Sequence, residues 1–200
     1  MAPHSFAVYH LMALPSIDNV STDGFMKQLG HASLIIPLLH QEDSETSDEE
    51  KSALSEVLCR QLSHSEGVRG FFAVYLTSPE SLTVDNVPVV LAEAVKNADK
   101  KVMVPLACMN VIMPTAMSSI HQDVELRECA SKTAVNGIKI LRLLKGSDDV
   151  SMNCKAIMSV CRGTGDGSED LIEFWNRFFV SYGYADEQKE DIALVMSEFC

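Results

Sequence analysis

The residues with the most useful chemistry in this chain lie at the end of a stretch without charge. Met109, Met113 and Met117 recur at intervals of four, which places their thioethers on one face of a helix. His121 follows them closely. A methionine face can line an adaptable groove, and a nearby imidazole can anchor a polar group. We therefore take these four residues as candidate ligand-binding residues, although packing in a core explains the same methionine pattern.

A second concentration of chemistry lies near the end of the sequence, where six aromatic residues fall between positions 174 and 184. Helical spacing puts Phe174, Phe178 and Tyr182 on one face and Trp175 on the neighbouring face. Aromatic side chains bury large areas, so we expect this helix to dock on the rest of the protein. Any part of it that stays exposed would instead mark a partner-binding site, with Trp175 and Phe178 as candidates.

The sequence contains no assembled set of catalytic or metal-binding residues. It has no HExxH motif, no Cys/His spacing typical of zinc sites and no nucleophile motif. The one enzymatic hypothesis pairs His121 with a carboxylate such as Asp123. Cys154 and Cys161 share a helical face, but a reactive thiol needs positive surroundings that the sequence does not guarantee. We assign no catalytic residue and no metal ligand, leave the cofactor open, and favour a non-enzymatic protein over an enzyme.

The glycine-rich segment Gly163–Ser168 resembles a phosphate-binding loop only in its composition. Such a loop should follow a strand and carry a lysine, whereas here a predicted helix precedes it. Asp166, Glu169 and Asp170 already supply negative charge at the following helix start. The segment is therefore predicted to be a turn and a helix N-cap.

The acidic composition limits the classes of partner. The chain has 28 acidic and 16 basic residues and a net charge of −12. Affinity for nucleic acids depends on lysine and arginine, so we expect no nucleic-acid binding. The six cysteines form no CxxC pair and the start of the sequence lacks a basic signal region. We expect reduced thiols in a soluble intracellular protein, which is cytoplasmic or, after removal of a transit peptide, organellar.

Hydrophobic periodicity and turn signals predict an all-α fold, an irregular bundle of about seven to nine helices in a single domain over residues 1–200. Phe71–Ser78 suits a buried strand as well as a helix, and we expect a helix because its surroundings are helical. Residues 102–120 are long enough to span a bilayer. Pro105, Pro114 and Asn110 would be costly in lipid, so we expect a buried, kinked core helix and no stable membrane span.

Two local signals support this helical interpretation. Ser47 and Glu50 have the spacing of a capping box, which predicts a helix from there to about Ser65. Gly137 lies inside a second predicted helix, from Asp123 to Lys145, where glycine costs about 1 kcal/mol relative to alanine. We expect close packing against another helix to require that glycine.

The four-residue string FAVY occurs at Phe6–Tyr9 and again at Phe72–Tyr75. Asp-Asn-Val follows each copy, at an offset of 67, and Pro37 and Pro105 continue the match at an offset of 68. The offset grows from 66 to 68, as small loop insertions would produce, and such similarity suggests duplication of one structural unit. We therefore hypothesise a pseudo-twofold fold with halves 6–66 and 72–137 and a helical extension over 147–200. The alternative is that the two apolar segments are similar by chance.

Three functions follow from these patterns. The first is a non-enzymatic interaction or scaffold protein, which binds a protein partner or a second copy of itself. The alternative is a binding protein for a hydrophobic small molecule or pigment in a methionine-lined pocket. A histidine-dependent enzyme is the third. A pocket beside the methionines would favour the binder, and an exposed apolar patch would favour the scaffold.

Overall fold

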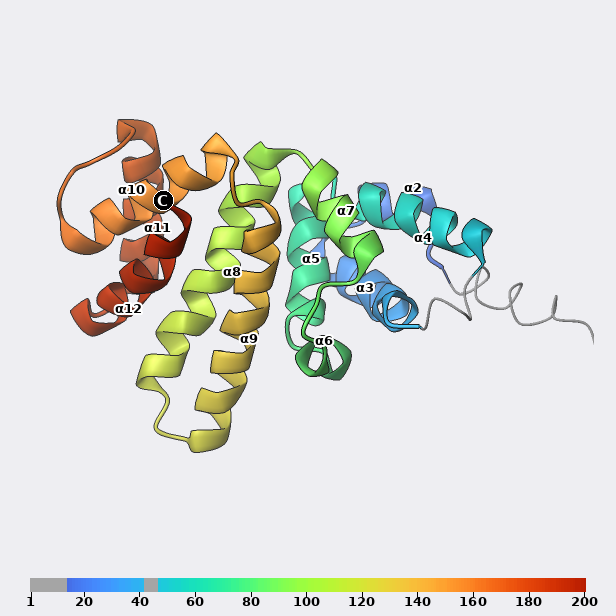
Figure 1. The fold of residues 1–200 in the computed structure, drawn as a ribbon, viewed down its shortest axis with the longest axis horizontal. Coiled ribbons are helices and arrows are strands. Elements are labelled where there is room, and N and C mark those ends of the chain that lie inside the picture. The colour runs from blue at the N-terminus through green and yellow to red at the C-terminus, as the bar shows by residue number, and fades with distance from the viewer. Residues whose placement is uncertain (1–13, 42–46) are drawn as a thin grey trace, which may run out of the picture. The chain divides into compact units, whose positions relative to one another are not determined.

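The computed structural model describes residues 14–41 and 47–200, and within these ranges the chain is all α-helical (Figure 1). The all-α prediction is therefore confirmed. These ranges hold eleven α-helices and a final 3-10 turn, which exceeds the seven to nine expected. The excess comes partly from short helices such as α2 (Ile17–Thr22) and α6 (Pro79–Thr83), which are too brief to show a hydrophobic period.

The chain divides into two compact units, one up to Leu106 and one from Ala107 onward, with the division inside α8 (Lys100–Ile120). The single domain stays a prediction. Besides α2 and α6, the first unit contains α3 (Phe25–Leu39), α4 (Asp48–Gln61), α5 (Ser65–Tyr75) and α7 (Val89–Asn97). The second contains α9 (Val124–Leu143), α10 (Asp148–Arg162), α11 (Glu169–Tyr182), α12 (Asp186–Met196) and the turn η1 (Ser197–Phe199).

Local signals in the first unit act as the sequence predicts. The Ser47 hydroxyl accepts the Glu50 N–H, and the Glu50 carboxylate accepts the Ser47 N–H, so the predicted capping box starts α4. The ambiguous segment from Phe71 is helical through Tyr75, which confirms the expected helix. Its phenylalanines are fully buried, so tertiary packing decides between helix and strand where composition could not.

A buried amide network joins four helices of the first unit. The Gln28 side chain, fully buried on α3, donates to the backbone carbonyls of Val20 and Asp23. The Gln61 amide on α4 donates to both the backbone and side-chain oxygens of Gln28. His64 donates from Nε2 to the same Val20 carbonyl and accepts the Gly67 N–H at Nδ1, which caps α5. Buried polar groups of this kind specify one packing because each needs its partner.

The same region brings the backbones of α3 and α5 close together. A Cβ built on Gly70 of α5 would lie 2.4 Å from the Gln28 Cβ and 3.0 Å from the Gln28 backbone carbon. Only glycine allows α5 to approach α3 this closely without displacing backbone. The contact fixes the direction of α3, which in turn carries Leu39 and His40 at its end.

In the second unit, α10 packs against α11, α12 and η1. Trp175 of α11 is fully buried and donates from Nε1 to the Asn153 side chain of α10 at 3.0 Å. A Cβ on Gly137 would lie 2.5 Å from the Asn110 carbonyl oxygen, which confirms that close packing requires this glycine inside α9. Figure 1 shows α8 and α9 running side by side, consistent with that contact.

The uncharged stretch forms α8, and one face of it is buried. The buried positions recur as neighbouring pairs every four residues: Met103, Val104, Ala107, Cys108, Val111, Ile112, Thr115 and Ala116. In the described part of the chain, α8 alone is long and apolar enough to cross a bilayer, and 44% of its most apolar window is buried. A core helix passes the same test, so the absence of a stable span stays a prediction.

The proposed duplication also stays a prediction. The first FAVY copy lies outside the described residues, and the second lies at the end of α5. Asp18–Val20 are helical in α2, whereas the matching residues 85–87 lie in the non-helical segment before α7.

Replacing Gly70 tests the α3–α5 approach. We expect Gly70→Ala to destabilise the protein by ~1–3 kcal/mol, because the added methyl meets Gln28 backbone and Cβ atoms. Gly30→Ala is the control, since Gly30 lies on α3 and an added Cβ there would have nothing within 4 Å. That substitution should stabilise by roughly 0.5–1 kcal/mol through helix propensity. Urea unfolding followed by circular dichroism measures both, and equal effects of the two variants would contradict the close approach.

Candidate functional site

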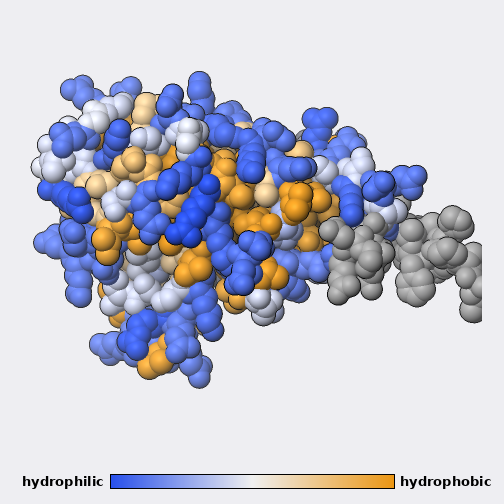
Figure 2. Space-filling view, viewed as in Figure 1, coloured by the Kyte–Doolittle hydropathy of each residue, from blue (hydrophilic) through white to orange (hydrophobic). Residues whose placement is uncertain are grey.

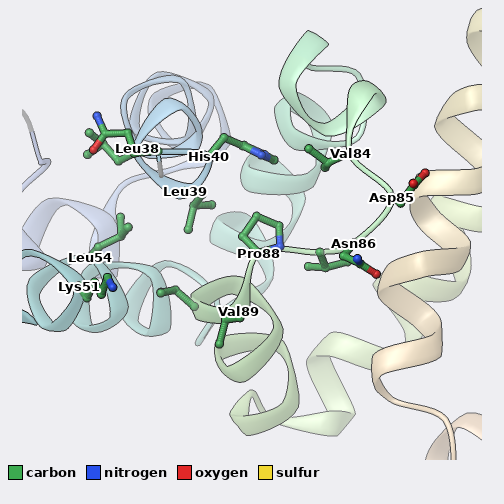
Figure 3. Close-up of a pocket in the computed structure, with 13 residues that line it drawn as sticks. Leu38, Leu39, His40, Lys51, Leu54, Val84, Asp85, Asn86, Pro88 and Val89 are labelled. Atoms are coloured by element: carbon green, nitrogen blue, oxygen red, sulfur yellow. The ribbon is translucent and has the colours of Figure 1, made fainter. Parts of the chain in front are cut away.

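A cavity of about 520 Å³ lies in the first unit, between the end of α3, the first turns of α4 and the start of α7 (Figure 3). Its walls are mainly apolar and include Leu38, Leu39, Leu54, Val84, Val87, Pro88, Val89 and Val90. Volumes of this size, with apolar walls and a few polar groups, are typical of small-molecule sites. None of the residues proposed from the sequence lines this cavity.

The side chains converge from segments far apart in the sequence. In Figure 3, Leu39, Leu54 and Pro88 point toward the same space, whereas Asp85 points away from it. Figure 2 shows hydrophobic side chains gathered where α7 begins and along the segment before it. Val89, at the first position of α7, is 72% exposed. The apolar wall therefore continues from the interior to the surface.

His40 places a buried polar atom in the wall of this cavity. The residue occupies the C-cap position of α3, and its ring stacks on Tyr75 of α5, with centroids 6.0 Å apart. Its Nε2 atom is buried and has no hydrogen-bond partner among the residues that the structure describes. Burial lowers the pKa of His40, and the nearby Glu80 carboxylate opposes that shift. The imidazole is therefore neutral at pH 7, with one ring nitrogen able to form a hydrogen bond with a bound molecule.

The remaining polar lining residues are Gln41, Lys51, Asp85 and Asn86. Asp85 and Asn86 are exposed, and Lys51 comes from the first turns of α4. Their positions give the cavity a hydrophilic edge around an apolar interior. Such an arrangement suits a molecule with an apolar body and a polar end.

The methionine face lies elsewhere, on the more exposed side of α8. Met113 is 37% and Met117 is 40% exposed, while Met109 is half-buried. His121 is half-buried just after the helix. The three methionines share a helical face as the spacing predicts, and the role of all four residues in binding stays a prediction.

Asp123 has a structural task in this arrangement. One oxygen of its carboxylate accepts the N–H groups of Glu125 and Leu126, at 2.8 and 3.1 Å, and so caps α9. A carboxylate at a helix N-terminus is stabilised by the helix dipole. The residue thus has a role that needs no catalysis, and pairing with His121 stays a hypothesis.

The aromatic residues of α11 divide between core and surface. Trp175 lies in the core and makes edge-to-face contacts with Phe174 and Phe178. Its ring centroid lies 5.0 Å from that of Phe174 and 5.6 Å from that of Phe178. Phe178 is half-buried, and Tyr182 is 51% exposed. The burial of Trp175 agrees with the expectation that this helix docks through its aromatic residues. Phe174, Phe178 and Tyr182 form a partly open edge beside it, which we call the aromatic edge.

The other sequence candidates behave as packing or turn residues. Among the described residues, no three His, Cys, Asp or Glu side chains group as metal ligands. Burial raises the pKa of Cys161 to about 12 despite Lys189 and Arg162, so this thiol stays protonated at neutral pH. Gly163 ends α10 with φ of 67°, and Ser168 occupies the N-cap position of α11. The predicted turn is confirmed, although the Ser168 side chain makes no capping bond.

Sequence reasoning missed the cavity because its residues carry no motif. His40 could have been noticed as a histidine directly after an apolar helix and before an acidic run. Its stacking on Tyr75, 35 positions later, depends on how α3 and α5 pack, which a single sequence does not reveal.

The pKa of His40 makes stability depend on pH. Because burial holds this pKa below its ordinary value of 6.5, the unfolded chain binds the proton more readily just below that pH. Neutral His40 therefore makes its full contribution to the free energy of unfolding above pH ~6.5. This contribution is lost as the pH falls. Urea unfolding of wild type and His40→Gln across this range should show the wild-type advantage shrinking toward acid. Parallel pH profiles would contradict this, and Glu80→Gln should steepen the loss.

Comparison with known proteins assigns the chain to a family. Neither a curated protein nor a solved structure matches the chain. A family described as "Uncharacterised conserved protein UCP020893" matches residues 34–199, which include every residue that lines the cavity. The chain belongs to this family of uncharacterised conserved proteins.

Proposed function

We propose that this protein binds an amphipathic small molecule in the cavity of its first unit. The observation that carries the proposal is the buried, unpartnered Nε2 of His40 beside apolar walls. A buried polar atom without a partner costs about 1–3 kcal/mol, so folded proteins rarely keep one without a reason. A ligand that forms this hydrogen bond would recover part of that cost.

The surroundings of His40 indicate the chemistry of the ligand. The leucine, valine and proline walls favour an apolar body, since burial of apolar surface contributes roughly 25 cal/mol per Å². The neutral ring nitrogen favours an uncharged group such as a hydroxyl or an amide, which can donate as well as accept a hydrogen bond. The sequence analysis offered small-molecule binding as its alternative function and located the site at the methionine face. The proposal keeps that function and locates the site at the end of α3.

The test begins with the protein purified from its own cells. Native mass spectrometry should find an extra mass of a few hundred daltons, which denaturation releases. His40→Phe keeps the stack on Tyr75 and removes the ring nitrogens, so it should weaken binding of the released compound about tenfold, the worth of one hydrogen bond. Binding can be measured by calorimetry.

His121→Phe is the matched control, because it removes the histidine beside the methionine face. It should leave affinity unchanged. Weaker binding in His121→Phe with normal binding in His40→Phe would place the ligand at the methionines and overturn the proposed cavity. A purified protein without any adduct would count against a small-molecule function altogether.

A second candidate, protein binding, is favoured by the aromatic edge of α11. Tyr182 is half exposed, and its ring stacks on that of Tyr184 with the centroids 5.7 Å apart. Acidic residues lie at both ends of this region, with Glu169 and Asp170 in the first turn of α11 and further acids at the start of α12. An apolar strip among acids fits an amphipathic helix with lysine or arginine on its polar face, and the acids disfavour a second copy of the chain.

Trp175 can report this interaction, because it is the one tryptophan in the sequence and contacts two residues of the aromatic edge. A synthetic amphipathic peptide with lysine on its polar face should change Trp175 fluorescence at low salt, and a glutamate version should not. Tyr182→Ser should weaken binding several-fold, whereas Val180→Ser, 73% exposed and outside the aromatic edge, should not. Equal binding of the two peptides would exclude this partner class.

A further inference from the structure

Five sulfur atoms come together in the second unit, on α8, α10, α12 and the residue after η1. They belong to Cys108, Cys154, Met158, Met196 and Cys200, which we call the sulfur cluster. The Cys154 Sγ lies 3.8 Å from the Met196 Sδ. The Cys200 Sγ lies 3.2 Å from the Met158 Sδ. The Cys108 and Cys154 thiols are hydrogen-bonded to each other, so Cys154 has two sulfur neighbours.

The cluster has an inner and an outer part. Cys108, Cys154 and Met196 are fully buried. Cys200 is exposed and Met158 is half-buried, and both line a cavity of about 250 Å³. The Cys200 thiol also reaches the Met196 backbone carbonyl at 3.7 Å. The sulfur atoms therefore extend from a surface cavity to buried positions in the interior.

Thiol and thioether sulfur are soft donors, which select Cu(I) among biological metals. We propose that the sulfur cluster binds one Cu(I) ion, held by Cys108, Cys154 and Met196, with Cys200 and Met158 as the outer pair that passes the ion inward. In a three-coordinate centre with metal–sulfur bonds of ~2.3 Å, as for zinc thiolates, the sulfur atoms lie roughly 4 Å apart. The Cys154–Met196 separation of 3.8 Å already fits that requirement.

Each bond from the metal to a cysteine replaces an S–H bond, because the thiolate is the form of cysteine that ligates metals. Cu(I) binding at Cys108 and Cys154 forms two copper–sulfur bonds, breaks the two S–H bonds and releases two protons to solvent, with no change in oxidation state. Met196 contributes a lone pair from its thioether sulfur and releases no proton.

Other ions fit the cluster less well. Zinc structural sites need four ligands from cysteine, histidine or carboxylates, and the described residues group no three of these together. The neutral thioethers of Met158 and Met196 are poor ligands for hard cations such as Mg²⁺. A site built from thiols and thioethers is instead suited to Cu(I).

The experiment is an anaerobic titration of the reduced full-length protein with Cu(I) supplied as its bicinchoninate complex. We expect the protein to take one equivalent from the chelator, with a Cu–S distance of ~2.3 Å by X-ray absorption. Because protons are released when the thiols bind the metal, affinity should rise with pH. Met196→Leu nearly preserves volume and should keep the fold. It should weaken binding at least tenfold, and Cys154→Ala should abolish the one-equivalent site.

The matched control uses two exposed cysteines outside the cluster. Cys59→Ser with Cys129→Ser removes as many thiols as the inner site contains and should leave affinity within twofold of wild type. Loss of binding in that control, or unchanged binding in Met196→Leu and Cys154→Ala, would overturn the proposal. Failure of wild type to take copper from the chelator would overturn it as well. Because the proposed small-molecule cavity lies in the other unit, none of these outcomes bears on it.

Discussion

The approach of α3 to α5 is the constraint on which the first unit depends. Gly70 lets the two backbones meet at Gln28, and the Gln28 amide then ties together α2, α3 and α4. This network leaves little freedom in the direction of α3, because each amide has a specific backbone carbonyl as its partner. The position of His40 on Tyr75 follows from that direction.

Gln28 and His40 differ in how their buried polar atoms are satisfied. Both belong to α3 or its cap and both place polar atoms in the interior. The Gln28 amide has two backbone acceptors, whereas the buried ring nitrogen of His40 has no partner within residues 14–41 and 47–200. The first arrangement stabilises a fold on its own. The second costs free energy that other contacts must compensate, and the ligand that we propose would recover part of that cost.

The fold class, the capping box at Ser47 and the need for Gly137 could be predicted from the sequence, because each depends on local spacing or composition. The long uncharged stretch shows the limit of such reasoning. Its composition is apolar on every side, so the sequence could not tell that Met113 and Met117 face outward while Val111 is buried. The cavity was missed for a related reason: its residues come from α3, α4, α7 and the segment before α7, and local spacing does not reveal how these pack.

The distribution of charge links both candidate sites to the acidic composition. The net charge of the chain is −12, and in the part that the structure describes, acidic side chains such as Asp48, Glu49, Glu169 and Asp170 are exposed. The groups offered in the interior are neutral: an imidazole in one unit, thiols and thioethers in the other. Neutral groups can be buried without the large desolvation cost of an ion, so each site can remain ready without a charged partner. Recognition at either proposed site would then depend on shape and on the softness or hydrogen-bonding capacity of a few buried atoms.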